Sequence, residues 1–298
     1  MNIARLLDRS GRSAGDRPAL ARGGEILCDY AGLARRAAAF AGGLRERFSL
    51  QRGDRVALIM KNVPEYLEAL YGCWWGGFAA VPVNAKLHPS EFAYMLENSG
   101  ARLAVVSPEL AEGIAQKAAG LDSLDAIVAT DSQDFAALRR ADPAPLAVCG
   151  DDELAWLFYT SGTTGRPKGA MLTHGNLMAM TLCYFSDVDA ISPRDCILHA
   201  APLSHGSGLY NIPHVAQAAL NIVPESGGFD PAEVFALLER YSGLTAFFAP
   251  TMVGRLTAAP GAAGARTENL KTIVYGGGPM YVADLKRAMA TFGQKFVQ

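Results

Sequence analysis

Hydroxyl groups, glycines and one lysine are concentrated in residues 159–169, which read Tyr-Thr-Ser-Gly-Thr-Thr-Gly-Arg-Pro-Lys-Gly. The apolar runs 154–158 and 170–172 flank this stretch, so we expect two short buried strands joined by a polar loop. Glycine lets backbone N–H groups approach a ligand closely, hydroxyls add donors, and a lysine adds a positive charge. These are the groups that bind phosphate, and they predict a nucleotide-binding loop.

The candidate phosphate-binding residues of this loop are Thr160, Ser161, Gly162, Thr163, Thr164, Gly165 and Lys168. Their spacing differs from that of a Walker P-loop, in which Gly-Lys-Ser/Thr stands at the start of a helix. Here Pro167 precedes the lysine and Gly169 follows it, so a helix cannot begin in the usual way. A P-loop phosphotransferase is therefore disfavoured. An ordinary hairpin turn is the plain structural alternative.

Two further segments place small or polar groups directly after a predicted strand. His205 follows the run 196–201, with glycines after it. The run 271–275 leads into Gly276, Gly277, Gly278 and Pro279. Ligands of open α/β sheets bind at the carboxyl ends of strands, so both segments are candidate site residues. A structural histidine and an ordinary glycine-rich turn are the alternatives.

Apolar runs alternate with amphipathic helical patterns from residue 55 onward. The predicted strands are 56–60, 78–83, 102–106, 126–128, 154–158, 170–172, 196–201, 244–248, 271–275 and the last residues, 295–298. Helices are predicted after Asn62, from Pro89, from His174, after Asp230 and from Val282. This alternation predicts an α/β fold on mostly parallel sheets, with helices on both faces.

Three local features refine this prediction. Asp230 followed by a proline and a glutamate is a clear helix start, whose buried face is expected to include Val234 and Leu237. His174 is expected to act as a cap, a surface residue or a ligand. Residues 122–152, rich in Ala, Asp and Pro, are expected to be a loose surface connection between two halves.

Composition excludes several classes of protein. Half of the 298 residues are hydrophobic, and 27 basic against 29 acidic residues leave a net charge of -2. Without a broad basic field, binding to nucleic acid or an anionic membrane is not expected. The run 69–85 is uncharged but broken by Gly76, Gly77 and Pro82, which favours a buried helix and strand over a transmembrane segment. No secretory signal is evident, so we expect a cytoplasmic protein.

The cysteines also bear on compartment and metal binding. They are odd in number, widely spaced and never in a Cys-x-x-Cys pair: Cys28, Cys73, Cys149, Cys183 and Cys196. This pattern argues against a disulfide framework and against a zinc cluster. We expect reduced and mostly buried thiols.

Residues 159–169 closely resemble the signature loop of the adenylate-forming superfamily, which includes acyl-CoA synthetases, amino-acid adenylation domains and luciferases. Residues 202–205 are similar to its Pro-Leu-Phe-His segment, with Ser204 replacing the aromatic residue. Residues 276–279 resemble its Gly-Gly-Ala-Pro turn. The resemblance implies an incomplete N-terminal AMP-binding domain over 1–298, with approximate halves 1–150 and 151–298. Each half would be a mixed, mostly parallel sheet subdomain, stacked on the other, and the C-terminal lid domain would lie beyond Gln298.

The resemblance also implies chemistry. The loop would close over the β- and γ-phosphates of ATP, His205 would position a carboxylate near the α-phosphate, and residues 276–279 would pack along adenine. Lys168 and His205 are then the catalytic candidates. The implied reaction converts a fatty or aryl carboxylate and ATP into acyl adenylate and pyrophosphate, and then transfers the acyl group to coenzyme A. Mg²⁺ is an implied cofactor whose ligands are unknown.

Two other functions stay open at this point. An amino-acid or aryl-acid adenylation domain uses the same loop, and a non-catalytic ATP-binding module could hold ATP without turnover. We expect residues 1–298 alone not to make acyl-CoA, because the implied residues for thioester formation lie beyond them. The acid, the acceptor and the oligomeric state, homo-oligomer included, are not determined by these residues.

Overall fold

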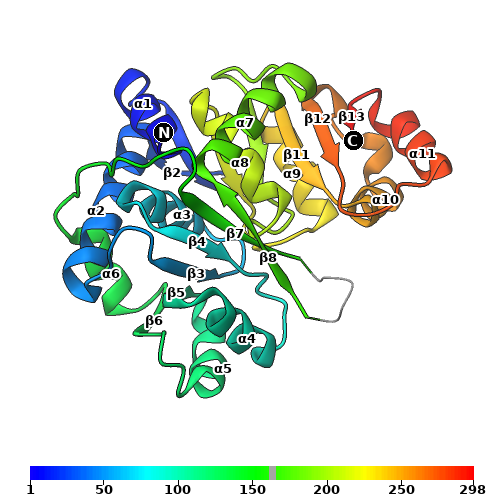
Figure 1. The fold of residues 1–298 in the computed structure, drawn as a ribbon. Helices are drawn as coiled ribbons and strands as arrows, with labels where there is room; N and C mark the ends of the chain where they lie inside the picture. The colour runs from blue at the N-terminus through cyan, green and yellow to red at the C-terminus, as the bar shows by residue number, and fades with distance from the viewer. Residues whose placement is uncertain (161–165) are drawn as a thin grey trace. The chain divides into compact units, whose positions relative to one another are not determined.

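The computed structural model describes residues 1–160 and 166–298, and the chain divides into two compact units with one sheet each (Figure 1). Unit 1 contains Met1–Gly11, Ala31–Lys61 and Glu65–Met180. Unit 2 contains Arg12–Tyr30, Asn62–Pro64 and Thr181–Gln298. The units interleave along the chain rather than following the expected halves 1–150 and 151–298, because strands from each half pair within the sheet of the other unit.

The sheet of unit 1 has six strands in the order β6-β5-β3-β4-β7-β8. Their bounds are β3 Arg55–Ile59, β4 Ala79–Pro82, β5 Ala101–Val106, β6 Ala126–Ala129, β7 Leu154–Thr160 and β8 Lys168–Thr173. Neighbouring strands are parallel except β7 and β8, which are antiparallel. The predicted alternation of strands and helices is confirmed here, because each parallel pair needs a crossover connection.

The helices of unit 1 include α2 Tyr30–Phe48, α3 Pro64–Gly76, α4 Pro89–Ser99, α5 Pro108–Ala118 and α6 Gln133–Arg140. The first residue of α2 and of α3 belongs to unit 2, and α1 (Arg5–Ser13) and α7 (His174–Cys183) also contain residues of both units. The strands β3, β4 and β5 pack their apolar side chains against α4 and α5, with Ile59, Phe92 and Ile114 buried in one cluster. Burial of such side chains is the main favourable term in folding.

Two expectations for unit 1 are wrong. Residues 170–172 form a strand but not a buried one: the side chain of Met171 is 70% exposed, because β8 is the edge strand of the sheet. Residues 122–152 are not simply loose, because α6 lies within them. Ser132 caps α6 by accepting a hydrogen bond from the Phe135 backbone N–H (3.2 Å), and Phe135 is buried.

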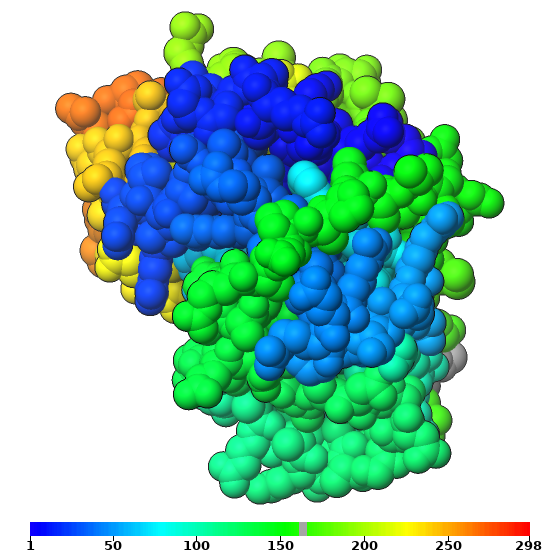
Figure 2. All heavy atoms as spheres, turned by 90° about the vertical axis from the view of Figure 1, so that its left-hand side faces the viewer, coloured from blue at the N-terminus to red at the C-terminus, as the bar shows by residue number. Residues whose placement is uncertain are grey.

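The segment after α6 is also tied down. The backbone N–H of Ala144 donates to the carbonyl of Ala38 in α2 (2.9 Å), and that of Ala147 donates to the carbonyl of Trp75 (2.9 Å). Figure 2 shows this segment, in green, lying against blue residues of the N-terminal region. A composition rich in Ala, Asp and Pro did not reveal these bonds because they join residues far apart in sequence.

The sheet of unit 2 has seven strands in the order β13-β12-β11-β9-β10-β1-β2, parallel except for β1 and β2. Their bounds are β1 Pro18–Arg22, β2 Glu25–Asp29, β9 Cys196–Leu198, β10 Leu220–Val223, β11 Leu244–Phe248, β12 Leu270–Tyr275 and β13 Phe296–Val297. The helices are α8 Gly206–Ala216, α9 Pro231–Arg240, α10 Pro250–Ala258 and α11 Val282–Phe292. Short helical segments occupy Tyr184–Val188 (a π-helix), Ala262–Gly264 and Thr267–Asn269.

The predicted start of α9 is confirmed, since Asp230 accepts hydrogen bonds from the backbone N–H groups of Ala232 (2.8 Å) and Glu233 (3.4 Å). The helix predicted from Val282 is confirmed as α11, in which Phe292 is buried and Val282, in the first turn, is 69% exposed.

The cysteines and the candidate membrane segment behave as expected from their local context. All five thiols are free, and Cys73, Cys149 and Cys196 are buried. The run 69–85 forms the end of α3 followed by β4. In residues 1–160 and 166–298, none of the helices combines the length and hydrophobicity that a membrane span requires.

Candidate functional site

Thr160 and Lys168 face each other as the last pair of the β7–β8 hairpin, and both side chains are exposed. Residues 161–165, which include the predicted phosphate-binding residues Ser161, Gly162, Thr163, Thr164 and Gly165, lie outside the described residues. Lys168 begins β8, so the interpretation that Pro167 and Gly169 prevent a helix here is confirmed. The hairpin therefore presents the lysine ammonium group to solvent at the point where the strands separate.

Helix α4 holds this end of the hairpin. The hydroxyl of Tyr94 donates to the carbonyl of Pro167 (3.3 Å), and the guanidinium of Arg166 lies 5.8 Å from the centre of the Tyr94 ring. The hydroxyl of Tyr159 donates to Oδ1 of Asn98 (2.7 Å). A cation over an aromatic face is attracted to the ring. Together with the two hydrogen bonds, this makes three contacts that connect α4 to the hairpin.

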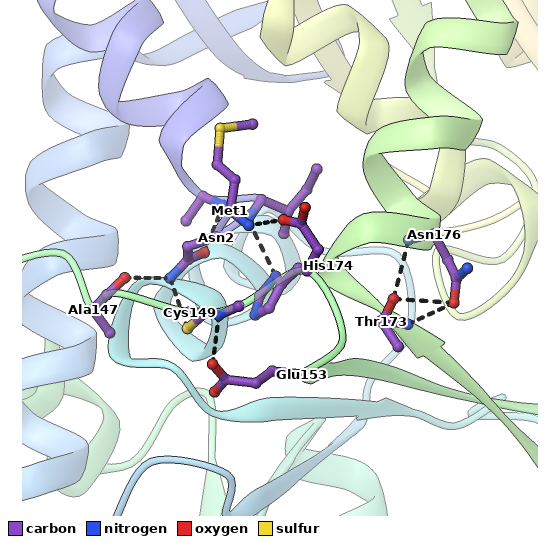
Figure 3. Close-up of polar contacts among 12 residues, drawn as sticks. Met1, Asn2, Ala147, Cys149, Glu153, Thr173, His174 and Asn176 are labelled. Carbon is purple, nitrogen blue, oxygen red and sulfur yellow. Dashed lines mark hydrogen bonds and ion pairs between the residues drawn. The ribbon is translucent and has the colours of Figure 1, made fainter.

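The opposite end of β8 is fixed by a reciprocal pair of hydrogen bonds (Figure 3). The backbone N–H of Thr173 donates to Oδ1 of Asn176 (3.0 Å), and the backbone N–H of Asn176 donates to Oγ1 of Thr173 (3.1 Å). This is the capping-box arrangement with asparagine in the third helical position. Strand β8 thus passes directly into α7 without a flexible connection.

His174 is a buried structural residue and not the surface residue that was one expectation. Its Nδ1 accepts a hydrogen bond from the backbone N–H of Ile3 (3.1 Å), and only 1% of the residue is exposed. Burial lowers the pKa of His174 to about 4, which keeps the imidazole neutral and able to accept this bond. Asn2 adds hydrogen bonds to the carbonyls of Trp74 (2.6 Å) and Ala147 (3.0 Å).

In unit 2, His205 stands at the N-cap position of α8, after the loop that follows β9. Its Nδ1 lies 2.8 Å from Oγ of Ser204, and the serine side chain is buried. Burial also lowers the pKa of His205, so a neutral ring is favoured near pH 7. A neutral imidazole suits positioning of a substrate group better than charge neutralisation.

Asn62 organises the loop in front of His205. Its Nδ2 donates to the carbonyls of His199 (2.7 Å) and Ala201 (2.8 Å), and its Oδ1 accepts from the backbone N–H of Leu203 (3.0 Å). These bonds explain why β9 ends at Leu198 and not at Ala201 as predicted: the backbone carbonyls that would continue the strand bind this side chain instead.

A second buried network supports the start of α8. Nδ1 of His199 lies 2.8 Å from Oγ of Ser207, and its Nε2 lies 3.1 Å from Oδ1 of Asn221. All three residues are fully buried. Burial lowers the pKa of His199 to about 4, so it is a neutral hydrogen-bonding residue and not an ionised one.

The glycine bend after β12 lies against the same aromatic ring as the start of α8. A Cβ atom at Gly276 would be 3.6 Å from Cε2 of Phe247, and one at Gly206 would be 2.7 Å from its Cε1. Gly277 has a φ of +79°, which favours glycine, and it is exposed together with Gly278 and Pro279. Two of the three predicted site segments therefore meet around Phe247.

Sequence reasoning missed the residues that support these segments. No local motif marks Tyr94, Asn98 or Phe247, and Asn62 was noted only as the start of a predicted helix and not as a support of the 199–203 loop. Tyr210 also packs on Phe247, with ring centres 5.6 Å apart, and Tyr184 of the π-helix packs on Tyr210 at 5.2 Å. A π-helix is uncommon and often occurs near functional sites, but it has no reliable sequence signal.

No group of three or more His, Cys, Asp or Glu side chains in the described part of the chain could hold a metal ion. We derive no step through Mg²⁺.

The two sheets and the segments after β9 and β12 define an α/β protein with candidate ligand groups at strand ends. The AMP-binding enzyme family model matches residues 7–298. The chain belongs to this family. The resemblance that the three segments indicated is thereby confirmed, and so is the fold class.

Individual relatives agree with this family. The chain is 36% identical over 292 residues to a feruloyl-CoA synthase of an Amycolatopsis species. The alignment covers 97% of this chain and 57% of that protein. The chain is 32% identical over 256 residues to the fatty acid–[acyl-carrier-protein] ligase ScoC of Streptomyces coeruleorubidus, covering 84% of this chain and 48% of that one. The chain thus spans about half the length of these relatives.

Two solved structures share the fold. The N-terminal domain of FACL13 from Mycobacterium tuberculosis has a TM-score of 0.86 and 28% identity, covering 97% of this chain and 73% of that one. ATP-bound MatB from Rhodopseudomonas palustris has a TM-score of 0.86 and 28% identity, covering 99% of this chain and 59% of that one.

Proposed function

We propose that the whole protein is an AMP-forming acid–thiol ligase that activates a carboxylic acid with ATP and transfers the acyl group to coenzyme A. Family membership supports this, as do relatives named for feruloyl-CoA, benzoate–CoA and long-chain-fatty-acid–CoA formation. The observation that carries the proposal is the meeting of His205's helix and the Gly276 bend around Phe247, at the carboxyl ends of parallel strands.

In the proposed first step a carboxylate oxygen forms a bond to the α-phosphorus of ATP, and the bond from that phosphorus to the pyrophosphate oxygen breaks. Thr160, the loop through Gly165, and Lys168 would bind the polyphosphate, with the lysine offsetting charge on the leaving pyrophosphate. His205 would orient the carboxylate. Gly276, Gly277, Gly278 and Pro279 would lie along the adenine.

In the proposed second step the thiolate of coenzyme A attacks the acyl carbon and AMP leaves with its bonding electron pair. Carboxylate, triphosphate and thiolate repel one another, so the protein must supply alignment and charge neutralisation. Alignment of reactants by itself can lower a barrier by roughly 7–11 kcal/mol.

We infer that the acid is aromatic. The support comes from the feruloyl-CoA synthase relatives and from the cluster of Tyr184, Tyr210 and Phe247 beside the start of α8. Aromatic rings pack favourably against one another in edge-to-face or offset geometry. A long-chain aliphatic acid is the alternative, with the fatty-acid ligases among the relatives in its favour.

An acyl-carrier protein is a second candidate acceptor, favoured by the similarity to ScoC. Location in the cytoplasm, a homo-oligomeric state and a requirement for Mg²⁺ stay predictions from the sequence, as does inactivity of residues 1–298 alone in acyl-CoA formation.

The proposed function can be tested with acid-dependent exchange of labelled pyrophosphate into ATP, using the whole protein and a panel of ferulate, benzoate and long-chain fatty acids. We expect exchange with an aromatic acid and thioester formation on adding coenzyme A. Absence of exchange with every acid, while ATP still binds, would favour a non-catalytic ATP-binding module. Thioester formed only with a carrier protein would identify the second acceptor.

A further inference from the structure

The side chain of Lys168 is exposed, so the place from which it can reach a ligand is set by its backbone. A lysine side chain loses rotamer freedom when its ammonium group is fixed on a ligand, and this loss costs free energy. If the backbone of the lysine is already held in one conformation, less conformational entropy is lost when the ammonium group binds the ligand. The residues on either side of the lysine are therefore the ones that decide where the ammonium group can reach.

One neighbour of Lys168 is bonded directly to α4, and the other is connected to α4 through the side chain of Tyr159 in β7. On one side, the carbonyl of Pro167 accepts the hydrogen bond from the Tyr94 hydroxyl (3.3 Å). On the other, Gly169 lies against the ring of Tyr159, where a Cβ atom would be 3.1 Å from Cζ, and the Tyr159 hydroxyl donates to Asn98 (2.7 Å). Tyr94 and Asn98 are four residues apart, so they lie on one face of the helix.

Helix α4 is itself a firm support. His88 and Glu91 form a capping box at its start, and Gly100 ends it with a φ of +60°. Phe92 and Leu96 are buried in the core of unit 1. Burial and the neighbouring Tyr94 raise the pKa of Tyr159 to about 12, so its hydroxyl remains a donor at neutral pH.

We propose that Tyr94 and Asn98 are positioning residues that hold the backbone on both sides of Lys168 and so tune binding of the ATP polyphosphate. This inference rests on the proposed function. Neither residue needs to touch ATP, since each acts through the backbone that carries the lysine. Their effect should therefore depend on the lysine side chain being present.

The test uses the whole protein and the KM values for ATP and for the acid in pyrophosphate exchange. Tyr94→Phe and Asn98→Ala should each raise the KM for ATP roughly 3- to 10-fold, the effect of one lost hydrogen bond, and leave the KM for the acid unchanged. Tyr159→Phe should match Asn98→Ala, and combining the two should add nothing, because both remove the same bond. Glu97→Gln, an exposed change on the same helix, is the matched control.

The decisive measurement repeats Tyr94→Phe and Asn98→Ala in a Lys168→Ala background. If they act through the lysine, neither change alters the KM for ATP further. Independent, multiplying effects, or an unchanged KM in the single variants, would overturn the inference while leaving the ligase function intact. A wild-type protein without exchange would overturn the proposed function, and the inference with it.

Discussion

A Cβ atom on Gly206 would lie 2.7 Å from Cε1 of Phe247, so the first residue of α8 packs directly against that ring. Gly206→Ala should therefore displace the ring and lower the free energy of unfolding by about 1–3 kcal/mol, despite alanine's better helix propensity. Urea unfolding measures this change.

Gly276→Ala is the matched control, because its Cβ would be 3.6 Å from the same ring, an ordinary contact distance. We expect little loss of stability from it. Adding Phe247→Leu to Gly206→Ala should recover part of the lost stability. Equal effects of the two alanine substitutions would contradict this account of the packing.

Lys168→Ala in the whole protein should lower the rate of acid-dependent pyrophosphate exchange by about 10²–10³-fold, the usual effect of losing one preorganised donor to a developing charge. Lys117→Ala, which removes an exposed lysine on α5, serves as control and should leave the rate unchanged. Exchange at the wild-type rate in Lys168→Ala would remove this lysine from the proposed mechanism.

Asn62→Ala should destabilise unit 2 and weaken acid activation together. Three backbone groups, at His199, Ala201 and Leu203, would lose their hydrogen-bond partner inside the protein. Unpaired buried groups of this kind should lower the free energy of unfolding by roughly 2–4 kcal/mol in total. Because the loop leads to His205, we also expect a higher KM for the acid in the exchange assay.

Asn84→Ala is a suitable comparison, since the side chain of Asn84 accepts an exposed hydrogen bond from the backbone N–H of Lys86 (3.0 Å). Asn84→Ala should lower the free energy of unfolding by less than half as much as Asn62→Ala. If folded Asn62→Ala has the same KM for the acid as the wild type, the loop held by Asn62 does not contribute to acid binding.

Stability should fall as the pH drops from 7 to 5. Burial lowers the pKa values of His199 to about 4 and of His214 to about 3, whereas an unfolded histidine titrates near 6.5. Between these values the unfolded state binds protons that the native state does not, so the stability is complete above the unfolded pKa and is lost below it. Each histidine should contribute about 2 kcal/mol to the decrease at pH 5.

The contribution of one histidine can be isolated with His199→Gln. Urea unfolding of this variant at pH 7 and pH 5 should show a pH-dependent loss about 2 kcal/mol smaller than that of the wild type. Exposed His88, changed to Asn, provides the control. An unaltered pH dependence in His199→Gln would mean that folding does not lower the pKa of His199.

Local sequence was sufficient for many of the strands, for some of the helices and for the family, but it did not predict α1, α2, α5, α6, α8 or α10. Buried apolar runs predicted β3, β4, β5, β7, β11 and β12, and the Asp230-Pro231 pair predicted the start of α9. These features depend on neighbours within a few residues, which the sequence contains directly. Lys168 was singled out for the same reason, because its glycines, hydroxyls and proline are contiguous.

Tertiary structure alone decided how those elements are used. It placed β8 at a sheet edge, so Met171 is exposed, and it joined β1 and β2 to the sheet of unit 2. It also selected Asn62, whose partners lie up to 141 residues away, as the support of the His205 loop. Hydrogen bonds between distant segments leave no periodic or local pattern, because a partner is defined by the folded backbone and not by spacing along the chain.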